Sequence, residues 1–309
     1  MQEQRVPVDS DVSQAWTEVA QGARLSWHTF VNVPTPVDGS NFARARQLYP
    51  FEPVHDRARA YIGAALEHLL LWADHVAPFK FHPEQESNFQ QRPPYTLARA
   101  AMEAAAQAVW MLDTTDPREC IRRHVSLIRW DMHEHRKSKL DPAEKAEVQV
   151  RDDELVERVS AEFNEAEIRP PSGYLWVLRR ACNPDDLALD PDEVERLWRA
   201  ASGSAHGMYW PTQDLQHLVE VEGPDGSVRT IRVPDARQIA DVLQAAYIIT
   251  QYAVLKYAMF AGADLWSLID DSRRWLAGKI TFREGASAEV VERLSRPAGP
   301  MLEPDGGAS

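Results

Sequence analysis

Cysteine is scarce in this 309-residue chain, which contains only two, Cys120 and Cys182. No Cys-x-x-Cys pair or other zinc-ligand spacing occurs, so we expect no metal site or cofactor site built on thiols and no disulfide framework. Two isolated thiols are typical of a protein of the reducing cytoplasm. The amino-terminal residues lack a basic start followed by an apolar run, so the sequence predicts no signal peptide and a cytoplasmic location.

Basic residues are also few: the sequence has 34 Lys and Arg against 47 Asp and Glu, which gives a formal net charge of −13. A non-specific DNA binder, or a binder of acidic membranes, needs a clustered basic surface, so both classes are disfavoured. The only long apolar stretch, 242–263, contains two glutamines, a lysine and three tyrosines. That composition favours a buried helix over a membrane span, and we expect no membrane partner.

Apolar residues recur at spacings of three and four along most of the chain, which predicts a mainly α fold, a multi-helix bundle. One small β-hairpin is expected at about 218–233, where apolar and polar residues alternate on both sides of a Gly-Pro-Asp-Gly turn. The predicted helices cover residues 56–77, 95–112, 117–140, 143–166, 174–181, 192–206, 234–263 and 266–276.

The distribution of these signals divides the chain into three parts. Residues 1–50 contain several breakers and predict an N-terminal arm with one short helix at about 12–23. Residues 51–280 form the helical bundle domain. Residues 281–309 are expected to be a short helix followed by a disordered Pro/Gly tail.

The segment Glu195–Trp210, ERLWRAASGSAHGMYW, carries the most specific chemical signal. Arg199 and His206 are seven residues apart, close to two helical turns, so both point from one face, and small side chains such as Ser202 let a ligand approach it. An imidazole there can take the proton of a ribose 2′-hydroxyl while a guanidinium holds the phosphate, so Arg199 and His206 are the catalytic candidates and Ser202 a binding candidate.

The structural alternative is that Arg199 pairs with Glu195 and that His206 caps the helix end beside Gly207. Spacing alone does not decide between the two, because Arg118/His124 and Arg129/His135 have a similar separation. No carboxylate is placed to make a catalytic triad with a serine of this segment.

Three further groups of residues are binding candidates. Arg99 and Glu103 lie four apart on an alanine-rich helix and can form an ion pair that orients a partner such as Arg199. Arg122 belongs to the most basic stretch, residues 118–129, which is the best candidate surface for binding RNA or a phosphorylated ligand. The interpretation we favour is that these arginines pair with nearby acidic side chains. The remaining group consists of Asp131, His133, Glu134 and His135. Asp131 and His135 are four residues apart and share a helix face, but the group offers no third metal ligand, so no metal site is predicted.

Two segments carry a family resemblance. Thr96–Leu112 followed by Pro117–Ile128 looks like the central helices of uncharacterised helical families of actinobacteria, which are loosely grouped with the HEPN superfamily, and Arg196–Gly207 resembles their small-residue-then-histidine segment. The resemblance covers roughly residues 56–263, and its motifs are short and degenerate. It implies a helical bundle that forms a homodimer and cleaves RNA without a metal, in a toxin or phage-defence role.

Carried over residue by residue, the resemblance assigns the catalytic arginine to Arg199 and the histidine to His206. The sequence departs from the family pattern at Ala200, where a polar residue is typical. Arg118 and His124 match the family spacing, and Glu119 supplies the polar residue after the arginine. Arg118 lies at the start of a predicted helix, however, where we do not expect the site.

Two classes of function therefore remain open from the sequence. The first is an HEPN-like, metal-independent RNase that uses Arg199 and His206 and binds RNA at a local site. The second is a non-catalytic helical binding or scaffold protein that holds a small ligand or a protein partner, which the acidic charge favours. A metal-dependent enzyme built on residues 117–140 is a weaker third hypothesis.

Overall fold

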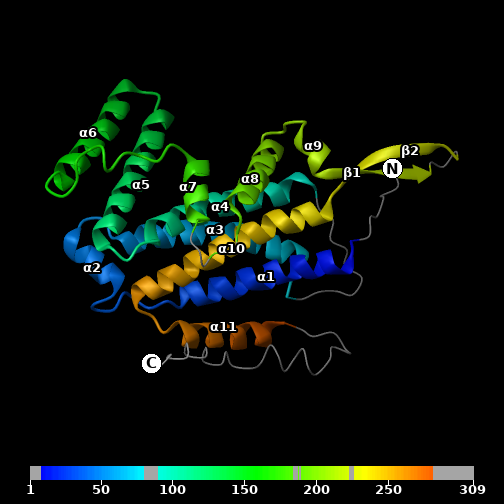
Figure 1. Ribbon diagram of the computed structural model, residues 1–309, viewed down its shortest axis with the longest axis horizontal. Coiled ribbons are helices and arrows are strands. Elements are labelled where there is room, and N and C mark those ends of the chain that lie inside the picture. Colours follow the sequence, from blue (N-terminus) through cyan, green and yellow to red (C-terminus); the bar gives the residue numbers. More distant parts are fainter. Residues whose placement is uncertain (1–7, 80–89, 184–186, 188, 223–225, 281–309) are drawn as a thin grey trace, which may run out of the picture.

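A computed structural model describes residues 8–79, 90–183, 187, 189–222 and 226–280, and within them the fold is mainly helical (Figure 1). The bundle and the single hairpin predicted from the sequence are both confirmed. The helices are α1 (Ser10–Val31), α2 (Asn41–Leu48), α3 (Val54–Val76), α4 (Arg92–Leu112), α5 (Pro117–Ser138), α6 (Pro142–Val159), α7 (Tyr174–Ala181), α8 (Pro191–Ala205), α9 (Pro211–Asp214), α10 (Ala236–Ala261) and α11 (Leu265–Lys279).

Three of the helices begin with the same Asp-Pro pair. Asp116, Asp141 and Asp190 each precede a proline at the first helical position, and each carboxylate accepts a hydrogen bond from the backbone N–H two residues on. The proline has no N–H to leave unpaired, and the carboxylate pairs one of the free N–H groups of the first turn. These local interactions explain why the starts of α5, α6 and α8 were predictable to within a residue or two.

Helix α4 is the centre of the bundle. It contacts α3, α5, α7, α8 and α10, and its alanines at positions 98, 101, 105, 106 and 108 are fully buried. Small side chains allow neighbouring helix axes to approach closely, as the alanine content predicted. The long helices α1, α3, α4 and α10 run side by side, while α5 and α6 stand at one end (Figure 1).

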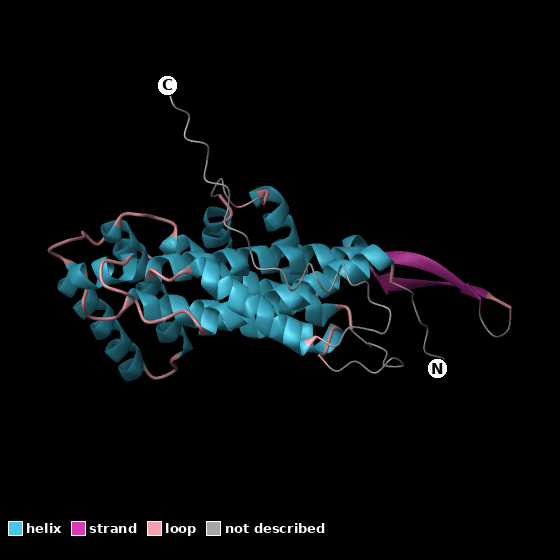
Figure 2. Ribbon diagram, turned by 90° about the horizontal axis from the view of Figure 1, so that it is seen from below, coloured by secondary structure: helices cyan, strands magenta, loops and turns pink. Residues whose placement is uncertain are grey.

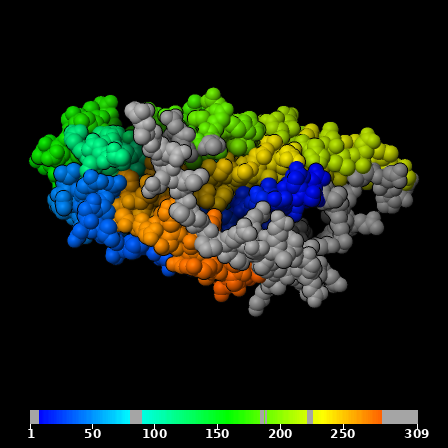
Figure 3. Space-filling model, turned by 60° about the horizontal axis from the view of Figure 1, so that its bottom comes forward, coloured from blue at the N-terminus to red at the C-terminus, as the bar shows by residue number. Residues whose placement is uncertain are grey.

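The amino-terminal region differs from the arm expected for residues 1–50. Helix α1 does not stop near residue 23 but continues to Val31, and it packs on α3, α10 and α11. Its buried positions recur at helical spacing along the whole length, although Arg24, Ser26 and Thr29 among them are polar, so α1 is part of the bundle. Helix α11 lies on the outside of α1, as Figure 3 shows for the blue and orange-red surfaces. The buried side chains of α1 include Val12, Trp16, Val19, Ala23 and Phe30.

Buried Arg24 explains how the end of α3 is held against α1. Its guanidinium donates to the backbone oxygens of Ala73 and Ala77, at 3.0 and 2.6 Å, and to the Asp74 carboxylate at 2.9 Å. The last carbonyls of a helix have no partner within the helix, so a cation that binds them stabilises its C-terminus.

The hairpin consists of β1 (Gln216–Glu222) and β2 (Val228–Pro234), antiparallel, with Val219 opposite Ile231. It extends beyond the end of the helices (Figure 2). Where the structure is described, α6 ends at Val159, earlier than the predicted 166, and α2 and α9 were not predicted. The predicted short helix and tail at 281–309 lie outside the described residues.

Both cysteines and the long apolar helix are buried, as expected. Cys120 and Cys182 are free, and burial raises the pKa of both thiols to about 12, so neither forms a reactive thiolate near neutral pH. Helix α10 is buried against α1, α3 and α4. No helix in the described part of the chain is both long enough and apolar enough to cross a bilayer.

Candidate functional site

The carboxyl end of α8 is closed by its own backbone. His206 is the C-cap residue, and Gly207 takes a positive φ of 72°, a conformation that favours glycine. The N–H of Gly207 donates to the carbonyl of Ser204 at 3.1 Å, and the N–H of Met208 donates to that of Gly203 at 2.9 Å. This pair of bonds is a Schellman ending, so the sequence His-Gly terminates α8 and fixes the place where the His206 side chain leaves the helix.

The small-residue face of α8 is occupied by the chain itself. Ala200, Ala201 and Gly203 are buried, and α8 packs on α4. A Cβ atom on Gly203 would lie 2.8 Å from Pro211 Cγ and 3.0 Å from Trp210 Cζ2. The close approach predicted for a ligand is therefore made at Gly203 by the residues that follow α8.

Arg199 and His206 are both exposed, but no hydrogen bond joins them in the described part of the chain. The Arg199 side chain is 56% exposed, and its Nε and Nη2 both lie 2.7 Å from Glu195 Oε1. Glu195 also accepts from Arg179, and hydrogen bonds from Arg199 and Arg179 lower the pKa of the Glu195 carboxyl. Arg199 thus adopts the ion pair that was the structural alternative for it.

His206 has a different guanidinium beside it. Arg99 Nη1 lies 3.3 Å from His206 Nε2, while Arg99 Nε donates to Glu103 Oε1 at 2.7 Å. The indole Nε1 of Trp198 donates to the same Glu103 oxygen at 2.9 Å, and the Arg99 guanidinium lies 5.7 Å from the centre of the Trp198 ring. The ion pair predicted for Arg99 and Glu103 is present, and it orients His206 rather than Arg199.

We call these four side chains, Arg99, Glu103, Trp198 and His206, the α4–α8 cluster. The Arg99 guanidinium can only donate, so Nε2 of His206 is the acceptor in this contact. When Nε2 turns from Arg99 to a substrate, its lone pair can accept a proton, and the Arg99 guanidinium beside it can bind a phosphate oxygen.

The other sequence-predicted binding residues lie apart from this cluster or make no side-chain bond to it. Ser202 is half-buried on α8, and within the described ranges its hydroxyl has no hydrogen bond to Arg99, Arg199 or His206. Arg122 lies on α5 and binds Glu119 with two hydrogen bonds, of 2.6 and 2.7 Å. The hydrogen bond from Arg122, followed by that from Arg123, lowers the pKa of the Glu119 carboxyl to about 2, so this basic stretch is largely neutralised.

The acidic and histidine residues of α5 are engaged in separate pairs. Asp131 lies 3.5 Å from Arg57, and His133 Nε2 lies 3.5 Å from a carboxylate oxygen of Asp152 on α6. Within the described residues, no three His, Cys, Asp or Glu side chains gather in a way that could hold a metal ion.

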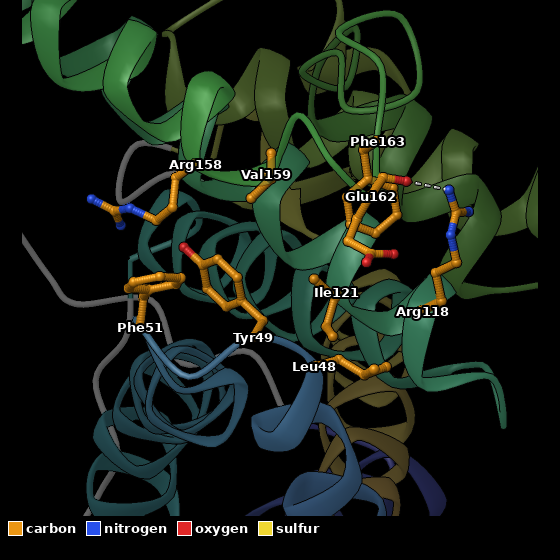
Figure 4. A pocket seen from close by; sticks show the side chains of 9 residues that line it. All are labelled: Leu48, Tyr49, Phe51, Arg118, Ile121, Arg158, Val159, Glu162 and Phe163. Carbon is orange, nitrogen blue, oxygen red and sulfur yellow. Dashed lines mark hydrogen bonds between the residues drawn. The ribbon is translucent and has the colours of Figure 1, made fainter.

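A small pocket of about 50 Å³, which no sequence pattern indicated, lies between α2, α5 and α6. Its floor is apolar, and Arg118 and Arg158 lie at opposite sides of it (Figure 4). Arg118 donates to the Glu162 carbonyl and packs on Phe163, while Arg158 donates to Glu52 and packs on Phe51. The pocket has room for a few waters, not for a nucleotide. It is lined by Leu48, Tyr49, Phe51, Arg118, Ile121, Arg158, Val159, Glu162 and Phe163.

Comparison with protein-family models, with curated proteins and with solved structures finds no match to this chain. Function is therefore inferred from the geometry of the α4–α8 cluster and from the sequence resemblance.

Replacing Glu103 by alanine is expected to lower the free energy of unfolding by about 2 kcal/mol, because Arg99 Nε and Trp198 Nε1 both lose their acceptor at a site where the Glu103 side chain is only 14% exposed. Chemical denaturation measures the change. The matched control is Glu195→Ala, which removes the carboxylate that pairs with Arg199; Glu195 is more exposed than Glu103, so its loss is expected to cost less. Equal effects of the two substitutions would show that the cluster is no better ordered than a surface pair.

Proposed function

We propose that the protein is an HEPN-like, metal-independent RNase and that the α4–α8 cluster binds and cleaves the phosphodiester. The observation that carries this proposal is the 3.3 Å contact between Arg99 Nη1 and the exposed His206 Nε2. A base and a phosphate-binding cation lie side by side at the surface, and Glu103 fixes the cation. The toxin or phage-defence role comes from the sequence resemblance.

In the proposed reaction, His206 Nε2 accepts the proton of a ribose 2′-hydroxyl as the 2′-oxygen bonds to phosphorus. The bond from phosphorus to the 5′-oxygen breaks, and the leaving oxygen takes a proton from water. The hydroxide left behind takes the proton that His206 accepted, which restores the base. The products are a 2′,3′-cyclic phosphate and a 5′-hydroxyl. Arg99 stabilises the additional negative charge of the phosphorane.

Arg99 takes the part that the family pattern gives to Arg199, because Arg99 lies 3.3 Å from His206 Nε2, whereas no hydrogen bond joins Arg199 to His206 in the described part of the chain. The Arg99–His206 contact is long for a hydrogen bond, so little is lost when Nε2 turns to the substrate instead. The resemblance also implies a homodimer in which the clusters of two copies face each other. Sedimentation of the purified chain tests that part of the proposal separately.

The proposal is tested by RNA degradation in the presence of a chelator, together with growth on expression in a bacterial host. We expect wild-type protein to cleave RNA and His206→Ala to lose at least about 100-fold in rate, as removal of a general base does. Arg99→Ala is expected to lose activity as well. His217→Ala is the matched control, because His217 is an exposed histidine on β1 outside the cluster. Wild-type protein that leaves RNA intact, or a His206→Ala variant with full activity, would overturn the proposal.

A second candidate function is a non-catalytic binding or scaffold protein. It is favoured by the charge balance of the α4–α8 region, where Glu103 neutralises Arg99 and Glu195 neutralises Arg199. Inert wild-type protein in the RNA assay would leave this candidate in place.

A further inference from the structure

Three consecutive apolar side chains are exposed immediately after the Schellman ending of α8. Met208 is 53% exposed, Tyr209 68% and Trp210 40%. Large apolar side chains scattered singly over a surface need no explanation, but three in succession beside a polar cluster indicate a contact surface. We call Met208–Trp210 the aromatic segment.

The aromatic segment is held in place by the residues around it. The Tyr209 carbonyl accepts from the N–H and the hydroxyl of Thr212, at 3.0 and 2.6 Å. Trp210 lies against Gly203, within 3.0 Å of where a Cβ atom would be. The backbone under Tyr209 is therefore fixed while its ring stands in solvent, and binding a flat partner to that ring costs little ordering.

Positive charge lies next to the aromatic segment. A Cβ atom on Gly207 would be 3.4 Å from Nη1 of Arg92, which places the Arg92 guanidinium beside the turn that leads to Tyr209. Arg92 is exposed, and among the described residues no carboxylate pairs with it. Arg99 contacts His206, the residue before Gly207 in the same turn. Two guanidinium groups therefore lie beside the residues that lead into the exposed ring.

From this arrangement we infer that the aromatic segment binds single-stranded RNA, with a base stacked on Tyr209 and the adjoining phosphates on Arg92 and Arg99. An exposed ring on a fixed backbone next to cations is the combination that binds unpaired nucleotides, since every base has a face that can stack and the nucleic-acid backbone is anionic. A duplex keeps its bases stacked on one another and cannot use the ring. The inference rests on the proposed function for the phosphate contact at Arg99 and adds the strandedness of the substrate.

The test separates binding from cleavage by using a fluorescent 2′-O-methyl RNA dodecamer, which has no free 2′-hydroxyl to react. We expect full-length Tyr209→Ala to bind it about 5- to 100-fold more weakly than wild type, and Tyr209→Phe to bind as wild type does. Arg92→Gln is expected to reduce the slope of log affinity against log salt by about 0.7, the value for one phosphate of a single strand. The same sequence as a duplex is expected to bind more weakly than the single strand.

The control for general effects of removing a ring is Trp266→Ala, an exposed tryptophan at the start of α11 with 43% exposure. Its affinity for the dodecamer is expected to be unchanged. If Tyr209→Ala binds like wild type, or if the duplex binds as tightly as the single strand, the inference is wrong, even where wild-type protein cleaves RNA. Conversely, Tyr209-dependent binding without any cleavage would reject the RNase proposal and leave the single-strand site standing.

Discussion

Replacing Arg129 by alanine is expected to lower the free energy of unfolding by about 3–5 kcal/mol. Arg129 on α5 donates from Nε and Nη2 to the two carboxylate oxygens of Asp152 on α6, at 2.9 and 3.0 Å. The two side chains are only 6% and 3% exposed. Removing the guanidinium leaves a buried carboxylate without its main partner, and that desolvated charge is what destabilises the fold.

The same ion pair gives a sharp control. Replacing both partners by apolar residues, Arg129→Met with Asp152→Leu, removes the buried charge altogether and is expected to cost much less than either single change. Arg196→Ala removes an exposed pair with Glu193 and is expected to cost under about 1 kcal/mol. Urea denaturation of wild type and these variants measures all of these effects. If Arg129→Ala were as stable as Arg196→Ala, the prediction that removal of Arg129 leaves a destabilising buried charge on Asp152 would be wrong.

Lowering the pH from about 6.5 to 4 is expected to destabilise the protein by about 3 kcal/mol through His124 alone. His124 is fully buried on α5, its Nε2 lies 2.9 Å from the Glu52 carbonyl, and among the described residues its Nδ1 has no hydrogen-bond partner. Burial, with the charge of Arg57 nearby, lowers its pKa to about 4. Above pH 6.5 the imidazole is neutral in both states and contributes nothing; between 6.5 and 4 the unfolded chain takes up the proton first, so stability falls.

The control is His124→Gln, whose amide can still donate to the Glu52 carbonyl but does not titrate. The difference in unfolding free energy between wild type and this variant, followed from pH 7 to 4, isolates the histidine from other groups. Glu119 contributes little to the pH dependence in this range, because its pKa of about 2 in the folded protein places most of the stability change from its protonation below pH 4. A difference that stays constant across the range would contradict the prediction, because it would show that His124 takes up its proton at the same pH in the folded protein as in the unfolded chain.

The elements predicted from the sequence are those with a strong local cause. Apolar spacing located α5 and α8, and the Gly-Pro-Asp-Gly turn located the hairpin. Helix α2 was missed because its eight residues bury only Phe42 and Ala45, too few for a periodic pattern. The full length of α1 was missed because buried polar residues, Arg24 among them, interrupt its apolar face.

Within the candidate site, the sequence predicted only the side-chain contacts between residues of the same helix. The i, i+4 spacing of Arg99 and Glu103 indicated their pairing, and Glu195 was the expected alternative partner of Arg199. The Arg99–His206 contact joins residues 107 positions apart, on α4 and α8, and depends on how those helices pack. The role of Trp198 was missed for the same reason, since its Nε1 reaches Glu103 only through the packing of α8 on α4.

The central position of α4 also determines how the molecule opens. Five helices lean on α4, so its amide hydrogens are shielded until the whole bundle separates, and they exchange with solvent only through global unfolding. Helix α6 packs mainly on α5, at one end of the molecule, and can lift away without disturbing that shielded centre. Opening of the α5–α6 end therefore leaves His206 and Arg99 in place.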